Sequence, residues 1–129
     1  MILGTGCDIV SIERIQRVLD RFGSHFAEKI LSEDEKKEIH GPLPIFLAGR
    51  FAAKEACAKA FGTGFRNGLA FPHIEVKNNA LGRPVFIFRE KAQSLARELG
   101  VHKAFLSISH EQSFAVAFVI LEGEDNGIF

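Results

Sequence analysis

The chain has 129 residues, of which 47% are hydrophobic, and its 16 Lys and Arg residues balance its 16 Asp and Glu residues. This length fits one compact domain with a substantial core, so we expect a single domain over residues 1–129. The zero net charge argues against a nucleic-acid binder, and no segment is long and apolar enough to suggest a membrane protein. The N-terminal segment has no basic stretch, and Asp8 interrupts its apolar run, which argues against a signal peptide and favours a cytoplasmic protein.

The first half of the chain is typical of one strand followed by helices. A short buried strand is expected from the N-terminus to about Cys7, and apolar residues at helical spacing predict a helix from about Ser11 to Phe22. A short helix is expected at residues 25–31. Ser32 and Glu35 form a capping-box pattern that opens another at residues 33–40, and a long helix is expected over residues 44–61.

The second half changes to strands. Residues 73–76 and 83–88, joined by a turn rich in Asn and Gly, predict a β-hairpin, and a helix closed by Gly100 is expected at residues 89–99. A second hairpin is expected from residues 103–109 and 114–121, whose last strand is apolar enough to be buried on both faces. The tail, residues 122–129, is polar and expected to be loose at its end. The fold class is α+β, with a largely antiparallel sheet packed with one long and several short helices.

The two cysteines show none of the Cys/His spacing typical of a zinc site. Cys7 lies in the expected first strand and Cys57 lies among alanines. We therefore expect both to be small buried thiols.

The long helix carries an unusual set of charges. Glu55 and Lys59 lie four residues apart on an edge that also carries Ala48 and Ala52. The ordinary interpretation is an ion pair on a solvated face, worth about 0.2–0.5 kcal/mol, and spacing alone favours it. The alternative is a ligand-binding face, because alanines let a ligand or another backbone come close.

Asp8 lies where the first strand is expected to end and a helix to begin. A carboxylate there can cap the helix. It can also hold a hard cation, because Mg²⁺ commonly takes one or two carboxylates together with substrate phosphate. Asp8 and Glu55 could supply that pair if the long helix packs against the first strand.

Four ordered segments carry a resemblance: GCDIVSIERI, RFAAKEACAKAFGTG, LGRPVF and SISHE. Over nearly its whole length the chain resembles the holo-acyl-carrier-protein synthases, the small bacterial class of 4′-phosphopantetheinyl transferases. The family pattern is G-x-D followed by F-x-x-K-E-x-x-x-K. The matching positions are Gly6, Asp8, Phe51, Lys54, Glu55 and Lys59.

The resemblance implies transfer of the phosphopantetheine arm of coenzyme A to a serine of apo-acyl carrier protein, with release of adenosine 3′,5′-bisphosphate. It implies Mg²⁺ held by Asp8 and Glu55, with Lys59 on the transferred phosphate. Glu55, directly or through a metal-bound water, is the expected base for the serine proton, and Lys59 is the alternative base. It further implies a homotrimer whose active sites lie between neighbouring subunits.

A further set of residues is expected to bind coenzyme A: Arg50, Lys59, Gly82, Arg83, Pro84, Ser109 and His110. Each has an ordinary explanation as well. Arg50, which shares a helix edge with Lys54, could equally pair with an acidic residue near the helix start. From the residues alone, His110 is expected to be a solvated histidine in a turn, and Gly82–Pro84 is expected to form a turn. Gly62–Gly64 follows a helix C-terminus, so a glycine cap is favoured there over a phosphate loop.

Arg14, Arg17 and Arg21 share one face of the first helix, turned away from its apolar stripe. Arginines suit carboxylate recognition, and the resemblance implies that this face receives the acidic carrier protein. An ordinary solvated face is the alternative. The acidic stretch from Glu33 to Glu38 is expected to be only a solvated helix start.

Two other functions use the same residues. A metal-dependent phosphodiester hydrolase could use the Asp8 and Glu55 pair with water as nucleophile, but it would need no protein-docking arginines. A non-catalytic interaction domain would leave the charges without a role. The arginine face therefore favours the transferase.

Overall fold

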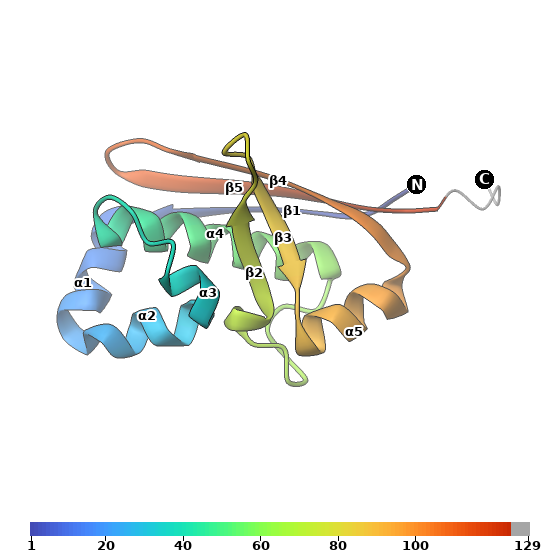
Figure 1. Ribbon diagram of the computed structural model, residues 1–129, viewed down its shortest axis with the longest axis horizontal. Helices are drawn as coiled ribbons and strands as arrows, with labels where there is room; N and C mark the ends of the chain where they lie inside the picture. Colours follow the sequence, from blue (N-terminus) through green and yellow to red (C-terminus); the bar gives the residue numbers. More distant parts are fainter. Residues whose placement is uncertain (125–129) are drawn as a thin grey trace.

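The computed structural model describes residues 1–124, and a three-stranded antiparallel sheet is its base. The strands are β1 (Ile2–Ser11), β5 (Phe114–Gly123) and β4 (Val101–His110), with β5 in the centre. The long helix α4 (Leu43–Phe61) lies along one face of this sheet (Figure 1). The expected α+β class with antiparallel pairing is confirmed.

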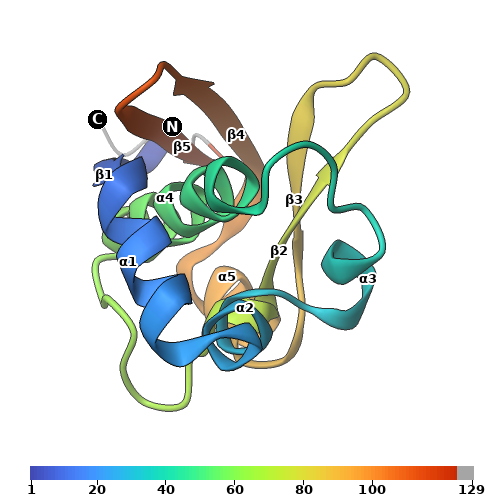
Figure 2. The same ribbon diagram turned by 90° about the vertical axis from the view of Figure 1, so that its left-hand side faces the viewer.

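A second antiparallel pair lies beside α4, next to the edge strand β4 of the sheet (Figure 2). It consists of β2 (Ile74–Asn78), which follows the short 3-10 helix η1 (Phe71–His73), and β3 (Pro84–Phe88). Helix α5 (Glu90–Leu99) follows β3 and ends at Gly100, which adopts the left-handed conformation of a glycine cap. Both predicted hairpins are therefore present.

Three short helices gather beside α4 at its N-terminal end (Figure 2). They are α1 (Ile12–Phe22), α2 (Ser24–Ile30) and α3 (Glu33–Lys36). The side chain of Ser11 caps α1 by accepting the amide N–H of Arg14 at 3.2 Å, so Asp8 is not the helix cap. The predicted capping box of Ser32 and Glu35 opens α3.

Glycines bring α4 onto β1. A Cβ atom added at Gly4 would collide with the carbonyl oxygen of Ala60, and one at Gly6 would collide with that of Ala56. Only glycine fits at these two positions, because the backbones of strand and helix touch there. The sequence did not reveal this packing, and it is what places Asp8 beside the charged residues of α4.

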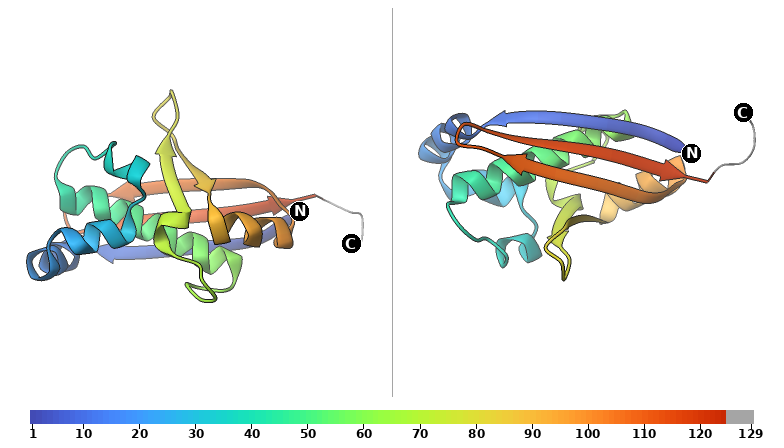
Figure 3. Two further views of the ribbon diagram at one scale, coloured as in Figure 1. Left: turned by 60° about the horizontal axis from the view of Figure 1, so that its bottom comes forward. Right: turned by 90° about the horizontal axis from the view of Figure 1, so that it is seen from above.

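Three sequence expectations about the sheet were wrong. Strand β1 continues to Ser11 rather than ending near Cys7, and Cys7 is exposed, while Cys57 is buried as expected. Strand β5 is buried on one face only, because its residues alternate between the α4 side and the opposite side. The opposite face of the sheet, seen in Figure 3, carries large apolar side chains that are 44–65% exposed. These are Ile9, Phe105, Phe114 and Phe118.

Within residues 1–124, no helix combines the length and apolar character that a bilayer span requires. The expectation that the chain is loose at its end concerns residues that lie outside the described part.

Candidate active site

Asp8 on β1 and Lys59 on α4 form the centre of the site. The ammonium of Lys59 donates to Oδ1 of Asp8 at 2.9 Å and to the carbonyl oxygen of Cys7 at 3.0 Å. Glu55 lies one helical turn before Lys59 and is partly buried. The structure therefore brings together the three side chains that were expected to carry the chemistry. The ion pair of Lys59 is formed with Asp8 and not, as the helical spacing alone suggested, with Glu55.

The electrostatics of the three groups are coupled. Burial raises the pKa of Glu55, the negative charge of Asp8 raises it further, and Lys59 opposes the shift. The hydrogen bond to Asp8 raises the pKa of Lys59, so its ammonium stays charged at neutral pH. A permanently charged Lys59 suits electrostatic contact with phosphate better than proton abstraction.

The carboxylates of Asp8 and Glu55 are close enough for Asp8 to act on the pKa of Glu55. No cluster of three or more His, Cys, Asp or Glu side chains suited to a metal occurs in residues 1–124. Two carboxylates nevertheless fit Mg²⁺, which usually completes its coordination with water and substrate phosphate oxygens. The donor set thus suits a magnesium ion that binds together with a phosphorylated substrate.

A hollow of about 550 Å³ opens beside these carboxylates. Asp8 and Glu55 lie on its wall, and apolar side chains of α1, α2 and α4 form much of the rest. Arg14 of α1 lines the same hollow. One member of the predicted arginine face is thereby placed next to the acidic pair.

The other two arginines of that face are engaged locally. Arg17 lies 3.4 Å from Glu13 in an exposed pair, and the guanidinium of Arg21 lies 5.2 Å from the centre of the Phe22 ring. Both remain exposed. The three arginines therefore form a continuous exposed face that ends at the hollow.

Arg50 and His110 meet in a second hollow, of about 240 Å³, on the β4 side of α4. Burial lowers the pKa of Arg50, and the charges of Glu35 and Glu38 oppose this. Its guanidinium lies 4.5 Å from the centre of the Phe46 ring. Gly49 packs close to Ile108 of β4 in this hollow, so α4 separates it from the Asp8 side.

The remaining residues expected to bind coenzyme A are dispersed. Gly82 has a positive φ of 81° in the β2–β3 turn, and Arg83 and Pro84 line a third hollow facing Phe105. Ser109 is exposed on the sheet face away from α4. A single chain therefore does not unite these residues with Asp8 and Glu55.

Lys54 is a buried structural residue. Its ammonium is fully buried and donates to Oε1 of Glu35 at 2.6 Å and to the carbonyl oxygens of Ile30 (2.6 Å) and Phe71 (3.1 Å). All three of its donors are thus satisfied. Burial lowers the pKa of Lys54, and Glu35 opposes that shift by its charge and its hydrogen bond.

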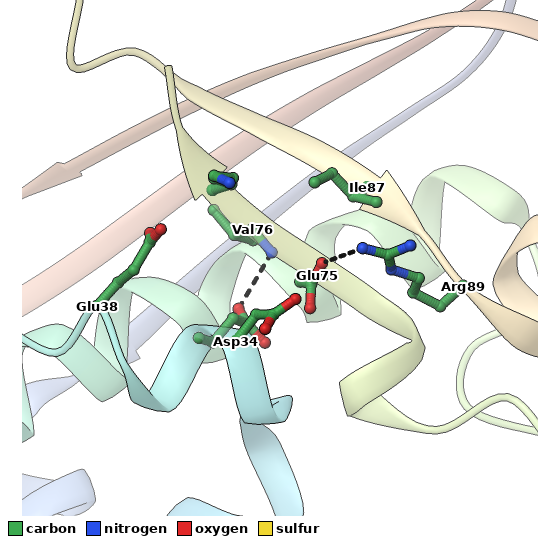
Figure 4. Close-up of a pocket in the computed structure, with 8 residues that line it drawn as sticks. Asp34, Glu38, Glu75, Val76, Ile87 and Arg89 are labelled. Carbon is green, nitrogen blue, oxygen red and sulfur yellow. Dashed lines mark hydrogen bonds and ion pairs between the residues drawn. The ribbon is translucent and has the colours of Figure 1, made fainter. Parts of the chain in front are cut away.

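Glu35 was wrongly assigned to a solvated helix start, since it is 1% exposed. Its Oε2 accepts the amide N–H of Val76 at 3.1 Å, and neighbouring Glu75 pairs with Arg89 at 3.3 Å (Figure 4). Ser32 joins the network by donating its hydroxyl to Glu75 at 2.6 Å. The network ties α3 and β2 to α4, and the capping box was the only signal in the sequence that Glu35 has a fixed position.

Comparisons with known proteins agree with this geometry. Residues 4–119 match the sequence profile of the 4′-phosphopantetheinyl transferase superfamily. The chain belongs to that superfamily. It is an enzyme of the phosphopantetheinyl transferase class, as the sequence segments predicted.

Individual relatives of this transferase cover almost the whole chain. A holo-[acyl-carrier-protein] synthase of Yersinia pestis is 50% identical over 123 residues, which are 94% of this chain and 98% of the relative. The crystal structure of holo-[acyl-carrier-protein] synthase from Neisseria meningitidis has a TM-score of 0.90 at 43% identity, covering 95% of this chain and 99% of that one. The Helicobacter pylori enzyme in complex with coenzyme A has a TM-score of 0.82 at 32% identity, covering 92% and 99%.

Proposed function

We propose that this chain transfers the 4′-phosphopantetheine group of coenzyme A to a serine of apo-acyl carrier protein. The observation that carries the proposal is the Asp8, Glu55 and Lys59 cluster beside a hollow whose wall also carries Arg14. A phosphoryl-transfer centre and an arginine face for an acidic protein are thereby adjacent. The coenzyme A complex of the Helicobacter pylori relative supports the choice of donor.

The reaction needs one bond made and one broken. The serine oxygen attacks the phosphorus that carries the pantetheine arm, and the bond from this phosphorus to the bridging oxygen of the pyrophosphate breaks. Adenosine 3′,5′-bisphosphate leaves with that oxygen. Glu55 is the base that accepts the serine proton, and burial together with the charge of Asp8 raises its pKa in the metal-free site, while Lys59 stabilises the charge on the transferred phosphate.

Asp8 and Glu55 are the residues that would hold Mg²⁺. A bound magnesium ion supplies neutralisation of the negative charge on the pyrophosphate. Lys59 already pairs with Asp8 at 2.9 Å, so its ammonium would lie close to phosphates bound at the acidic pair.

We further propose a homotrimer with coenzyme A bound between subunits, each a single cytoplasmic domain over residues 1–129. The Asp8 and Arg50 hollows share no lining residue and lie on opposite flanks of α4, which is about 10 Å wide. Phosphates of one coenzyme A reach both groups more easily if these come from neighbouring chains. The apolar outer face of the sheet supplies a surface for the assembly.

Mass spectrometry tests the function directly. Apo-acyl carrier protein incubated with coenzyme A, Mg²⁺ and this protein should gain the mass of one phosphopantetheine, with adenosine 3′,5′-bisphosphate in equal amount. Glu55→Gln protein is the control and should give neither product. Bisphosphate and free phosphopantetheine without modified carrier would instead establish a hydrolase, and no product at all would contradict both.

A further inference from the structure

Helix α4 is buried on nearly all of its sides. Among residues 46–61, every side chain is buried except Phe51, Glu55 and Lys59. Many of the buried positions are alanines, so the helix presents a similar small, apolar surface in most directions. A helix of this kind has no single apolar stripe that would fix its rotation about its own axis. Something other than the apolar pattern must therefore set the direction in which Glu55 points.

The contact between α4 and β1 restrains this rotation only weakly. It is made where Gly4 and Gly6 touch the backbone carbonyl oxygens of Ala60 and Ala56. Packed helices are normally held in one orientation by large side chains that fit between those of a neighbour. Two glycines and two alanines have few projecting atoms, so this contact sets how close the helix lies to the strand more firmly than it sets the rotation of the helix.

The end of the Lys54 side chain is held by three separate segments. Two of its hydrogen bonds go to the backbone carbonyl oxygens of Ile30, at the end of α2, and Phe71, in η1. The third goes to Oε1 of Glu35 on α3, and this carboxylate is itself fixed because its Oε2 accepts the amide N–H of Val76 on β2. Since the acceptors have fixed positions, all three hydrogen bonds form together only over a narrow range of rotation of α4.

Stability alone is a poor explanation for this buried ion pair. The free energy lost when two charges leave water roughly offsets their attraction, and apolar residues of similar volume often stabilise a protein as well or better. The best-attested use of a buried polar group is to select one arrangement of packed helices among several. Lys54 and Glu35 suit that use, because both are fully buried, all three ammonium hydrogens are donated and both carboxylate oxygens accept hydrogen bonds.

Glu55 directly follows Lys54, so the rotation that Lys54 fixes also sets the position of Glu55. Side chains end about 5–6 Å from the axis of a helix, and a rotation of about 20° would move such an end by about 2 Å. Misplacement of a reacting group by about 1 Å can lower a rate about a hundredfold. We propose that Lys54 is a positioning residue, which fixes the rotation of α4 and thereby holds Glu55 and Lys59 opposite Asp8. The inference rests on the proposed function, which assigns the chemistry to these three side chains.

The test replaces the ion pair by uncharged side chains. Lys54→Met/Glu35→Gln leaves no unpaired charge in the interior, and glutamine can still form a capping box. The matched control is Arg89→Met/Glu75→Gln, which removes the neighbouring ion pair of the same network, between β2 and the start of α5. Urea titration defines conditions under which both variants are fully folded. There, kcat of Lys54→Met/Glu35→Gln should fall about ten- to a hundredfold with the KM for carrier protein unchanged, whereas the control should keep both values.

A measurement without substrate reports the rotation itself. The side chains of Lys59 and Asp8, 2.9 Å apart at their ends, should show a through-space NMR contact in wild type and control, and this contact should be lost in Lys54→Met/Glu35→Gln. If that variant does not fold, Lys54→Gln, whose shorter amide reaches fewer of the three acceptors, takes its place.

Three results would each overturn the role of Lys54. They are a wild-type kcat in the folded variant, an intact contact between Lys59 and Asp8, and an equal fall of kcat in the control. Failure of wild type itself to modify the carrier protein would instead overturn the proposed function. The NMR comparison would still decide whether Lys54 sets the rotation of α4, so the two failures are distinguishable.

Discussion

Lys59 and Asp8, fifty-one residues apart in the chain, form an ion pair of 2.9 Å across the contact between α4 and β1. The contact exists because Gly4 and Gly6 let the helix backbone touch the strand. The distance between the proposed metal ligands therefore depends on residues that have no side chain.

The first prediction concerns this contact. Gly6→Ala should push α4 away from β1, because the new Cβ would collide with the carbonyl oxygen of Ala56. We expect a loss of about 1–3 kcal/mol in the free energy of unfolding, as for other overpacked sites, and a fall in transfer rate. Urea unfolding and initial rates measure both. Gln93→Ala, an exposed change on α5, should change neither by a comparable amount.

The second prediction concerns the acidic pair. Asp8→Asn and Glu55→Gln keep the shape of each side chain and remove its charge, so both variants should fold normally and lose at least about a hundredfold in rate. Circular dichroism checks the fold, and turnover is measured across a Mg²⁺ titration. Wild-type activity in both variants would exclude the pair as metal ligands.

The third prediction concerns pH. The base must be ionised, so the rate should fall as pH decreases through the raised pKa of Glu55. Lys59 holds this pKa down, and its removal in Lys59→Gln should raise the pKa further and move the acidic limb to higher pH. The residual rate is recorded from pH 5 to 8, beside a carboxyl NMR titration of Glu55. An acidic limb at its wild-type position would show that another group controls it.

The fourth prediction concerns carrier-protein docking. Charge reversal of Arg14 and Arg21 to Glu should raise the apparent KM for carrier protein, leave that for coenzyme A nearly unchanged and remove most of the salt sensitivity. Arg14→Glu alone should have the larger effect of the two single changes, since Arg14 lines the hollow with Asp8. Arg97→Glu, an exposed change on α5, is the charge-matched control. A double variant with the wild-type KM and salt slope would move the docking surface elsewhere.

The fifth prediction concerns subunit sharing. Light scattering should give a trimer. Inactive Asp8→Asn and His110→Ala chains, refolded together, should regain on the order of a quarter of the activity. In randomly mixed trimers, about one interface in four combines an intact Asp8 from one chain with an intact His110 from its neighbour. Asp8→Asn mixed with Glu55→Gln should regain none, since both residues serve the same chain's site. Equal activity in the two mixtures, or a fully active monomer, would contradict shared sites.

The local order of the chain could be predicted well from its sequence. Helical spacing located α1, the helices expected at residues 44–61 and 89–99 correspond to α4 and α5, and the Ser32 and Glu35 capping box is formed as expected. These features depend on residues within a few positions of one another. The resemblance to the family assigned roles to Asp8, Glu55 and Lys59, and the fold places these three side chains close together.

What could not be predicted depends on contacts between distant segments. Lys54 can be buried because Glu35, nineteen residues earlier, neutralises its charge. A periodic pattern of apolar residues does not indicate an ion-pair partner at such a distance along the chain. The sequence of an apolar strand such as β5 does not indicate whether its second face is covered by residues of the same chain or by another subunit. Cys7 was misplaced for the same reason, because it belongs to that outer face.

The central position of β5 has a consequence for synthesis on the ribosome. Strand β1 is made first, yet it pairs with β5, and the N-terminal amino group donates to the carbonyl oxygen of Gly123 at 2.7 Å. Strand β1 therefore has no pairing partner, and its apolar side chains stay exposed, until almost the whole chain has been synthesised. Asp8 lies on β1. A nascent chain that stalls before β5 therefore already contains all the proposed catalytic residues but still lacks the sheet that holds Asp8 in place.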